Sequence, residues 1–252
     1  MQLSFIVPAH NEQAHIGACL AAIHQACQPL GYSYEILVAA DACTDLTATL
    51  AQQGGARVIP VEHRHIAATR NSGAAASQGQ WLFFVDADTQ VSPAAVAAAC
   101  RNLLKGNAGG GGLFRFDKPV PFYGLVVERA AWIFCLLTHM SGGCFLHCQR
   151  HIFEKIGGFD SRLYAGEELA FAHAVKAHGR FRVVPHTVLT SARKVRLYSG
   201  RELLRMVFTI LRKGPRALMD RTDLGLWYQR REEKQQSQSL PTGSTFGGGG
   251  GS

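Results

Sequence analysis

Glycine-based phosphate-binding motifs are missing from this 252-residue sequence. The segment after its first strand-like run, Pro8-Ala9-His10-Asn11-Glu12, contains no glycine. The G-x-G-x-x-G pattern of dinucleotide-binding folds and the G-x-x-x-x-G-K-[ST] phosphate loop are absent from the whole sequence. These absences argue against a Rossmann-type oxidoreductase and a P-loop enzyme, so any phosphate must be held in another way.

Cysteine pairs at metal-binding spacing are missing as well. The seven cysteines are odd in number and scattered, with no C-x-x-C pair and no Cys/His set at zinc spacing. We expect buried or free thiols in a reducing compartment. The chain starts with a strand-like run, and no basic region or cleavage site precedes it, which predicts no signal peptide. A cytoplasmic protein is therefore expected.

No uncharged apolar run is long enough to cross a bilayer, which takes about 18 residues or more. The nearest candidate, residues 122–140, is interrupted by Glu128 and Arg129. Its apolar part is too short to span, so the pattern predicts a buried helix, with an interfacial helix as the alternative.

The composition supports a folded core and an anionic partner. Hydrophobic residues make up 47% of the chain, enough to bury one large domain. The formal net charge of +8 favours phosphorylated ligands, acidic membrane surfaces or nucleic acid. Nucleic acid is not expected, because no recognised binding module and no interleaving of aromatic and basic residues is visible.

Strand and helix patterns alternate along the first hundred residues. Such alternation with short links predicts a mostly parallel, doubly wound sheet. Later the pattern loosens, and the glycine run 109–112 is expected to be flexible. The expected strands are 3–7, 35–39, 57–61, 81–85, 113–116, 142–146 and 181–184, and the expected helices are 12–27, 44–53, 66–77, 93–105, 122–140, 151–156, 167–178 and 199–213.

Two acids follow the apolar run Trp81-Leu82-Phe83-Phe84-Val85. Ligands of open α/β sheets bind beyond the carboxyl ends of strands, where Asp86 and Asp88 fall. Two carboxylates can share a hard cation, and that cation can hold a diphosphate. The alternative is a turn or a helix cap, because aspartate favours both.

Three further polar positions are candidates. Asp41 ends the second strand and could accept hydrogen bonds from a base or a ribose, while Asp45 after it suits a helix cap. Arg70, on a helix that flanks the sheet, either reaches a diphosphate, braces the acids or lies solvated. His186 is a candidate additional metal ligand, with a structural role as the alternative.

Taken in order, these residues resemble a known family. Five motifs carry the resemblance, and they resemble the family-2 glycosyltransferases of the GT-A fold over about residues 3–195. They are Pro8-x-x-Asn11-Glu12, Asp41-x-x-Thr44-Asp45, Arg70-Asn71-x-Gly73, Asp86-x-Asp88, and Gly157-Gly158-Phe159-Asp160 with Gly166-Glu167-Glu168. The resemblance implies an α/β fold: a mostly parallel, Rossmann-like sheet flanked by helices, with a C-terminal helical extension.

The resemblance also implies roles for individual residues. Pro8, Glu12 and Asp41 would contact the nucleotide, and Arg70 its phosphates. Asp86 and Asp88 would bind the sugar nucleotide and a Mn²⁺ or Mg²⁺ ion, with Asp88 as the more direct metal ligand.

Glu167 and Glu168 match the family's E-D motif, in which the second acid is the general base of inverting members. The expected reaction moves a sugar from a nucleotide-diphospho-sugar to an acceptor hydroxyl. A single transfer is expected, because the Q-x-x-R-W motif of processive synthases is missing.

Some positions depart from the family. Ala40 replaces the first of two adjacent aspartates, Ala42-Cys43 replace Gly-Ser, and Glu168 is one methylene longer than aspartate. Two alternatives therefore stay open: a nucleotidyltransferase on the same fold, or a degenerate transferase-like module that binds a membrane or a protein partner.

The C-terminal part is expected to differ from the sheet domain. We expect the transferase domain over residues 1–195, a basic amphipathic helical extension over 196–231, and a disordered tail over 232–252 whose glycine run resembles a linker. The basic helix could pack on the sheet domain or lie on an anionic membrane. The second option implies a lipid-linked acceptor and peripheral binding to the inner face of the membrane.

Overall fold

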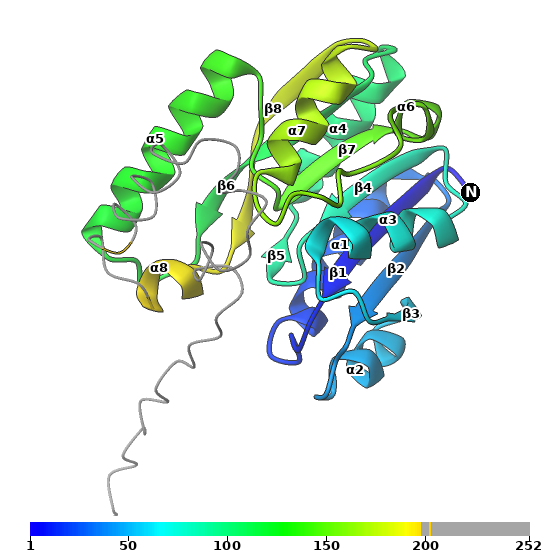
Figure 1. Cartoon of the computed structure of the whole chain (residues 1–252), viewed down its shortest axis with the longest axis vertical. Coiled ribbons are helices and arrows are strands. Elements are labelled where there is room, and N and C mark those ends of the chain that lie inside the picture. Colours follow the sequence, from blue (N-terminus) through cyan, green and yellow to red (C-terminus); the bar gives the residue numbers. More distant parts are fainter. Residues whose placement is uncertain (198–201, 203–252) are drawn as a thin grey trace, which may run out of the picture.

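The computed structural model describes residues 1–197 and residue 202 (Figure 1). The predicted helix 199–213 and the tail 232–252 lie outside the described residues. The strands are β1 Leu3–Ala9, β2 Tyr34–Asp41, β3 Arg57–Val61, β4 Trp81–Val85, β5 Thr89–Gln90, β6 Gly109–Phe116, β7 Phe145–Gln149 and β8 Phe181–Thr190. The α-helices are α1 Ile16–Cys27, α2 Thr47–Gln53, α3 Ile66–Ala76, α4 Pro93–Leu104, α5 Phe122–Thr138, α6 Arg150–Ile156, α7 Glu167–Lys176 and α8 Arg193–Leu197.

The strands form one eight-stranded sheet in the order β3-β2-β1-β4-β7-β6-β8-β5. The first four strands pair in parallel, whereas β7 and β5 run antiparallel to their neighbours. The chain moves from β1 to one side through β2 and β3, then returns to the other side at β4. This reversal between β1 and β4 is the switch point at which open α/β sheets bind their ligands.

The two faces of the sheet are covered by different helices. Side chains alternate across a strand, so Phe5 of β1 joins a core with α1 and α4, while Ile6 joins a core with α3, α6 and α7. Both strand residues are fully buried. Burial on two faces explains why β4 is a continuous apolar run and why Ser4 is the single polar residue of β1.

The glycine run was expected to be flexible, and this prediction is wrong. Residues 109–112 form the first half of β6, between β7 and β8. A Cβ on Gly110 would meet the Arg182 carbonyl oxygen, and one on Gly111 would meet the Ser141 side chain. Glycine is needed here because neighbouring groups approach the backbone closely.

Other elements differ at their boundaries. The strand expected at 142–146 begins only at Phe145, β8 extends to Thr190, and the short β5 has no counterpart among the expected elements. The helix expected over 122–140 is present as α5, but most of its large apolar side chains are exposed rather than buried. Within the described residues, no helix combines the length and the apolar composition needed to cross a membrane.

Candidate active site

Asp86 and Asp88 lie directly beyond β4, at the switch point. The Asp86 N–H donates to the Cys144 carbonyl (3.2 Å), and the Asp86 carbonyl accepts from the Thr89 N–H (2.9 Å). Asp88 Oδ1 accepts from the Thr190 hydroxyl at 3.5 Å. The acidic turn is thus held between the start of β7 and the end of β8. Burial, followed by the charges of Asp88 and Asp86, raises the pKa of the Cys19 thiol well above its usual range.

Arg70 joins this turn to the predicted catalytic helix. Its guanidinium is 2% exposed and donates to Asp86 Oδ1 and Glu167 Oε1, both at 2.8 Å, and to the Gly143 carbonyl at 3.1 Å. The ring of Phe159 lies 5.2 Å from its Cζ. Burial opposes the charge of Arg70, but the two carboxylates outweigh that effect and hold its pKa above the ordinary value.

Glu167 and Glu168 are the first two residues of α7. They lie on the side of Arg70 opposite to Asp86. Gly166 precedes them with a φ of 73°, a left-handed conformation that suits glycine. A Cβ on Gly143 would lie 3.6 Å from Glu168 Cβ, so the chain before β7 packs closely on this acid. Burial, and then the negative charge of Glu167, raise the pKa of Glu168 well above its usual range. A carboxyl group with such a pKa suits proton transfer near neutral pH.

The loop after β1 is tied to the last described helix. Pro8 is buried in β1 beyond Ile6, the last residue at which β1 pairs with β4. Glu12 receives a two-pronged ion pair from Arg193 of α8, with distances of 2.6 and 3.2 Å. Pro8 and Glu12 therefore flank the switch point, and Arg193 lies on its C-terminal side. Contact with a nucleotide stays a prediction for Pro8 and Glu12.

Asp41 is buried, and its carboxylate is hydrogen-bonded to groups of the chain itself. Its carboxylate accepts from the N–H groups of Arg64 and His65 and from the Thr69 hydroxyl, at 2.8 to 3.1 Å. It therefore holds the start of α3, the helix that carries Arg70. Contact with a nucleotide stays a prediction for this residue. Asp45 accepts from the N–H of Thr47, the first residue of α2, at 3.0 Å. The N-cap position itself is Leu46, so Asp45 serves the start of the helix from one position before the expected cap.

The three loops after β1, β2 and β3 share a strained backbone. Asn11, Ala42 and Arg64 have φ values of 52°, 48° and 48°. Positive φ suits glycine, the residue that Ala42 replaces in the pattern of the resembled family. Strain of this kind gathers at ligand sites, because the surrounding structure enforces it.

His186 is not brought together with the acidic pair. It lies on β8 four positions before Thr190, the residue that contacts Asp88, which is roughly 13 Å along a strand. Within the described part of the chain, no three His, Cys, Asp or Glu side chains are grouped so that they alone could hold a metal.

Three groups near the candidate site were not predicted from the sequence. The Gly143 carbonyl and the Thr190 hydroxyl face Arg70 and Asp88, but a backbone carbonyl and a lone threonine leave no sequence signal. His65, 8% exposed, lies beside Tyr164 with ring centroids 4.6 Å apart. Burial lowers the pKa of His65, although Glu167 and Asp41 act in the other direction.

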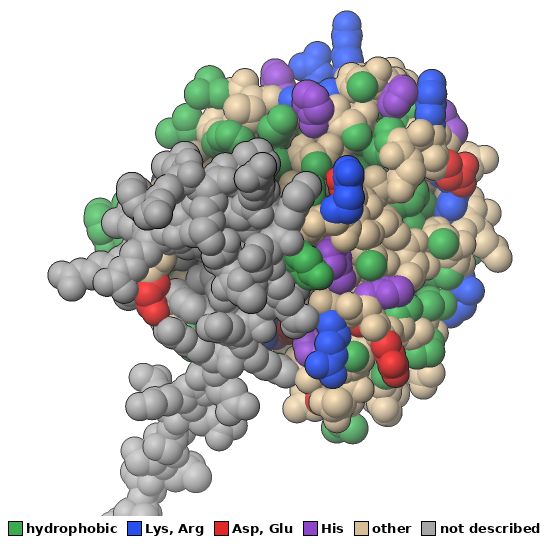
Figure 2. All heavy atoms as spheres, in the orientation of Figure 1, with side chains coloured by type: hydrophobic (Ala, Val, Ile, Leu, Met, Phe, Trp, Pro, Cys, Tyr) green, Lys and Arg blue, Asp and Glu red, His purple; other side chains and the backbone are tan. Residues whose placement is uncertain are grey.

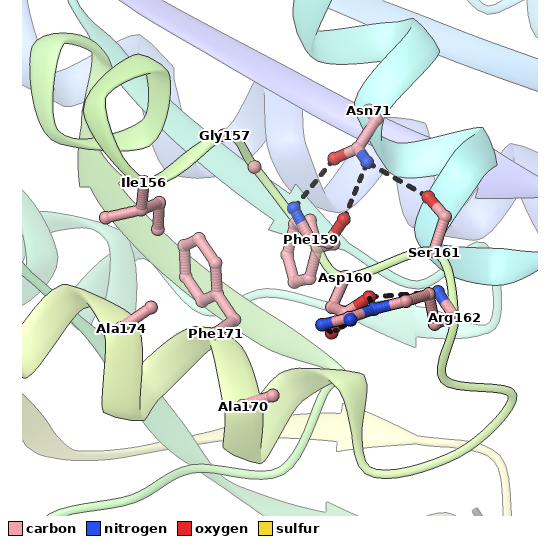
Figure 3. A pocket seen from close by; sticks show the side chains of 11 residues that line it. Asn71, Ile156, Gly157, Phe159, Asp160, Ser161, Arg162, Ala170, Phe171 and Ala174 are labelled. Carbon is pink, nitrogen blue, oxygen red and sulfur yellow. Dashed lines mark hydrogen bonds and ion pairs between the residues drawn. The ribbon is translucent and has the colours of Figure 1, made fainter. Parts of the chain in front are cut away.

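A pocket opens beside Asn71, the residue that follows Arg70 in the sequence, and none of the predicted site residues lines it (Figure 3). Its volume is about 510 Å³, and it lies between the 156–162 segment and α7. Asn71, adjacent to Arg70, pairs with both the N–H and the carbonyl of Phe159 at 2.9 Å. The Gly-Gly-Phe-Asp motif is thus anchored to the same helix as the buried arginine.

Residues 4–157 match the protein family described as Glycosyl transferase family 2. This chain belongs to that family. The match covers the switch point, Arg70 and the acidic turn, and it ends just before the Phe159 segment. No curated protein matches the sequence.

Solved structures share the fold of this chain at low sequence identity. Staphylococcus aureus TarS 1–349 has a TM-score of 0.60 at 16% identity, over 83% of this chain and 65% of that one. The mannosyltransferase PcManGT from Pyrobaculum calidifontis, in complex with GDP-Man and Mn²⁺, has a TM-score of 0.63 at 17% identity, over 86% and 62%.

Glucosyl-3-phosphoglycerate synthase from Mycobacterium tuberculosis, in complex with Mn²⁺, UDP and glucosyl-3-phosphoglycerate, has a TM-score of 0.54 at 19% identity, over 84% of this chain and 79% of that one. The chain thus has the GT-A fold, and it spans less than two thirds of the length of the TarS and PcManGT chains.

Proposed function

We propose that this transferase moves a sugar from a nucleotide-diphospho-sugar to an acceptor hydroxyl in one metal-dependent, inverting step, without processive elongation. The observation that carries the proposal is the buried Arg70, which joins Asp86 to Glu167 beside Glu168 at the switch point of the sheet. The groups that bind the donor and those that bind the acceptor would thus be positioned around the guanidinium of Arg70.

The donor would lie across the carboxyl ends of β1, β2 and β4. Pro8, Glu12 and Asp41 border the nucleotide part of this region, and Asp86 and Asp88 its diphosphate end. Solved structures of the same fold contain UDP-GlcNAc, GDP-Man or UDP, which supports a nucleotide sugar as the donor.

The side chains at the acidic turn fit a hard divalent cation. Both donors are carboxylate oxygens, which Mg²⁺ and Mn²⁺ prefer, and two carboxylates plus substrate phosphates are a usual magnesium set. Asp86 Oδ1 is already paired with Arg70, which leaves Asp88 as the principal ligand and Asp86 as its neighbour. The ion, when bound, would supply positive charge to the leaving diphosphate.

Glu168 is the proposed general base. Its raised pKa makes it a better proton acceptor than an ordinary carboxylate, provided that it is ionised. It would take the proton of the acceptor hydroxyl as the oxygen attacks the anomeric carbon. Glu167 is engaged with Arg70, so it would hold the helix and raise the basicity of Glu168.

Calorimetry with UDP-, GDP- and dTDP-sugars tests the donor site. We expect one nucleotide sugar to bind in the presence of Mn²⁺ or Mg²⁺ and not in EDTA, and Asp88→Ala to lose this binding. Glu154→Ala, a change at an exposed acid of α6, is the control and should bind normally.

Product analysis then separates sugar transfer from nucleotidyl transfer. Release of a nucleoside diphosphate from a nucleotide sugar supports the proposal, whereas release of pyrophosphate from a nucleoside triphosphate and a sugar 1-phosphate would assign the alternative reaction. If the wild type binds no nucleotide sugar under any condition, the proposed function is wrong.

A further inference from the structure

The long helix α5 turns its apolar side chains outward. It stands at the edge of the molecule, beyond β6 (Figure 1), and hydrophobic side chains are visible at this edge in the space-filling view (Figure 2). Leu137 is 78% exposed and Ile133 59% exposed. The exposed large apolar residues of the helix are Phe122, Leu125, Val126, Val127, Ile133, Phe134, Leu136 and Leu137.

Polar contacts, rather than this apolar side, attach α5 to the sheet. The buried Glu128 accepts from the Phe116 N–H at 2.8 Å, and the Trp132 indole N–H donates to the Phe114 carbonyl at 2.6 Å. At the other end of the helix, Lys176 of α7 donates to the Thr138 carbonyl at 2.6 Å. The apolar face is therefore not needed to hold the described fold together. Contiguous apolar surface of this kind marks an interaction site.

The charges on α5 indicate the kind of partner. Its only acid, Glu128, is 4% exposed, so the outer surface carries no carboxylate of this helix. Its only basic side chain, Arg129, is exposed and lies 4.4 Å from the Trp132 ring. A twofold contact between two copies of the helix would bring arginines together without an acid on either helix. An anionic surface matches this face better.

The length of α5 suits a helix that lies in the plane of a bilayer surface. Its 17 residues span about 25 Å, less than the hydrocarbon core of about 30 Å. An apolar face with an aromatic and a cationic side chain, and no exposed acid, is typical of interfacial helices. The sequence beyond α8 is rich in arginine, which would add attraction to anionic lipid.

We infer that α5 docks this transferase on an anionic lipid bilayer, with its apolar face inserted among the lipid headgroups. The chain after α5 runs to Gly143, which contacts Arg70 and packs beside Glu168. A bilayer on α5 would therefore lie next to the acceptor side of the site. Membrane binding itself does not depend on the proposed reaction.

Flotation of the full chain with vesicles tests the inference. The vesicles are pure phosphatidylcholine or phosphatidylcholine mixed with phosphatidylglycerol, without donor or metal. We expect the wild type to float with the mixed vesicles. The double variant Ile133→Ser/Leu137→Ser should bind at least roughly tenfold more weakly, because two large apolar side chains no longer enter the interface.

A matched control uses two leucines that are exposed elsewhere. Leu46 and Leu104 are both 61% exposed, so Leu46→Ser/Leu104→Ser removes similar apolar surface outside α5 and should float like the wild type. Near-UV circular dichroism confirms that both double variants are folded.

Several results would overturn the inference. The wild type could fail to float, or the α5 variant could float as well as the control. Vesicle binding could instead be lost only when Arg205, Arg212 and Lys213 are replaced by serine, with the α5 variant unaffected. A dimer in ultracentrifugation that the α5 variant breaks, without vesicle binding, would assign the face to a second copy. The α5 variant could also have a lowered melting temperature, again without vesicle binding. This result would mean that the apolar face of α5 binds the chain's own C-terminal segment.

Discussion

Arg70 shows most directly how a single residue organises this site. A buried arginine costs several kcal/mol in desolvation, which opposite charges and hydrogen bonds must offset. Here two carboxylates and one carbonyl surround the guanidinium. Such an arrangement is weak evidence for stability, since apolar residues of similar volume often serve a fold as well. Its position between the acidic turn and α7 indicates instead that it fixes Asp86 and Glu167 relative to each other.

Replacement of Glu168 by glutamine tests the proposed base. Glu168→Gln keeps the shape of the side chain and removes the proton acceptor, so kcat should fall about 10²- to 10⁴-fold. The KM for the donor should change little, because the proposed role of Glu168 is toward the acceptor. Steady-state kinetics check this, with Glu154→Gln as the control. A kcat within about twofold of the wild type would contradict the assignment.

The same substitution should change how stability depends on pH. Because the folded pKa of Glu168 is raised, the folded state keeps its proton at pH values where the unfolded chain has lost it, so wild-type stability falls as pH rises between the two pKa values. Glu168→Gln lacks this loss. We therefore measure the melting temperatures of both proteins from acidic to alkaline pH. The melting temperature of the variant should rise relative to that of the wild type as the pH increases above about 4.3, the ordinary pKa of glutamate. Parallel curves would contradict a raised pKa.

At the scale of elements, β6 illustrates a strand that depends on having no side chains. Four consecutive glycines would ordinarily favour a loop, because glycine has the largest conformational entropy to lose. In this fold the strand lies between β7 and β8, and the His147 ring and the Arg182 backbone lie where side chains would be. Pairing on both sides offsets the entropy cost.

Gly110→Ala should therefore destabilise the protein strongly. The added Cβ would meet the Arg182 carbonyl oxygen and, at 2.7 Å, His147 Nε2. We expect a loss of about 3 kcal/mol in the free energy of unfolding. Gly17→Ala is the control: nothing lies within 4 Å of that Cβ, and a helical alanine should add about 0.5–1 kcal/mol. Urea denaturation measures both. A neutral Gly110→Ala would mean that β6 is not packed as described.

At the scale of the whole molecule, the first loop and the last described helix meet across the switch point. Glu12 and Arg193 are 181 positions apart in sequence and form a two-pronged ion pair. Both side chains are largely shielded, at 15% and 27% exposure. Such geometry makes the pair stronger than a flexible surface pair.

A double-mutant cycle measures this link. Glu12→Gln, Arg193→Gln and the double variant should give a coupling energy of about 1 kcal/mol. The Arg150–Glu154 pair of α6, one turn apart at 3.7 Å, is the control and should give about 0.3–0.5 kcal/mol. Denaturant melts of all six variants provide the numbers. A Glu12–Arg193 coupling no larger than the control value would show that α8 does not hold the first loop.

The sequence by itself determined the alternation of strands and helices, the acids beyond β4 and the order of the family motifs. These features are readable because side-chain period, strand ends and capping residues depend on near neighbours in the chain. The hydrogen bond that Asp45 accepts at the start of α2 and the position of Asp86 and Asp88 are of this kind.

Only the tertiary structure decided which distant groups meet. It paired Arg70 with Glu167, placed the glycine run inside a sheet and turned the apolar side of α5 outward. The helix at 122–140 was predicted correctly, but the expectation that it is buried failed, because an apolar pattern shows that a face avoids water but not what covers it. Long-range pairing depends on how the whole chain packs, and no local pattern records it.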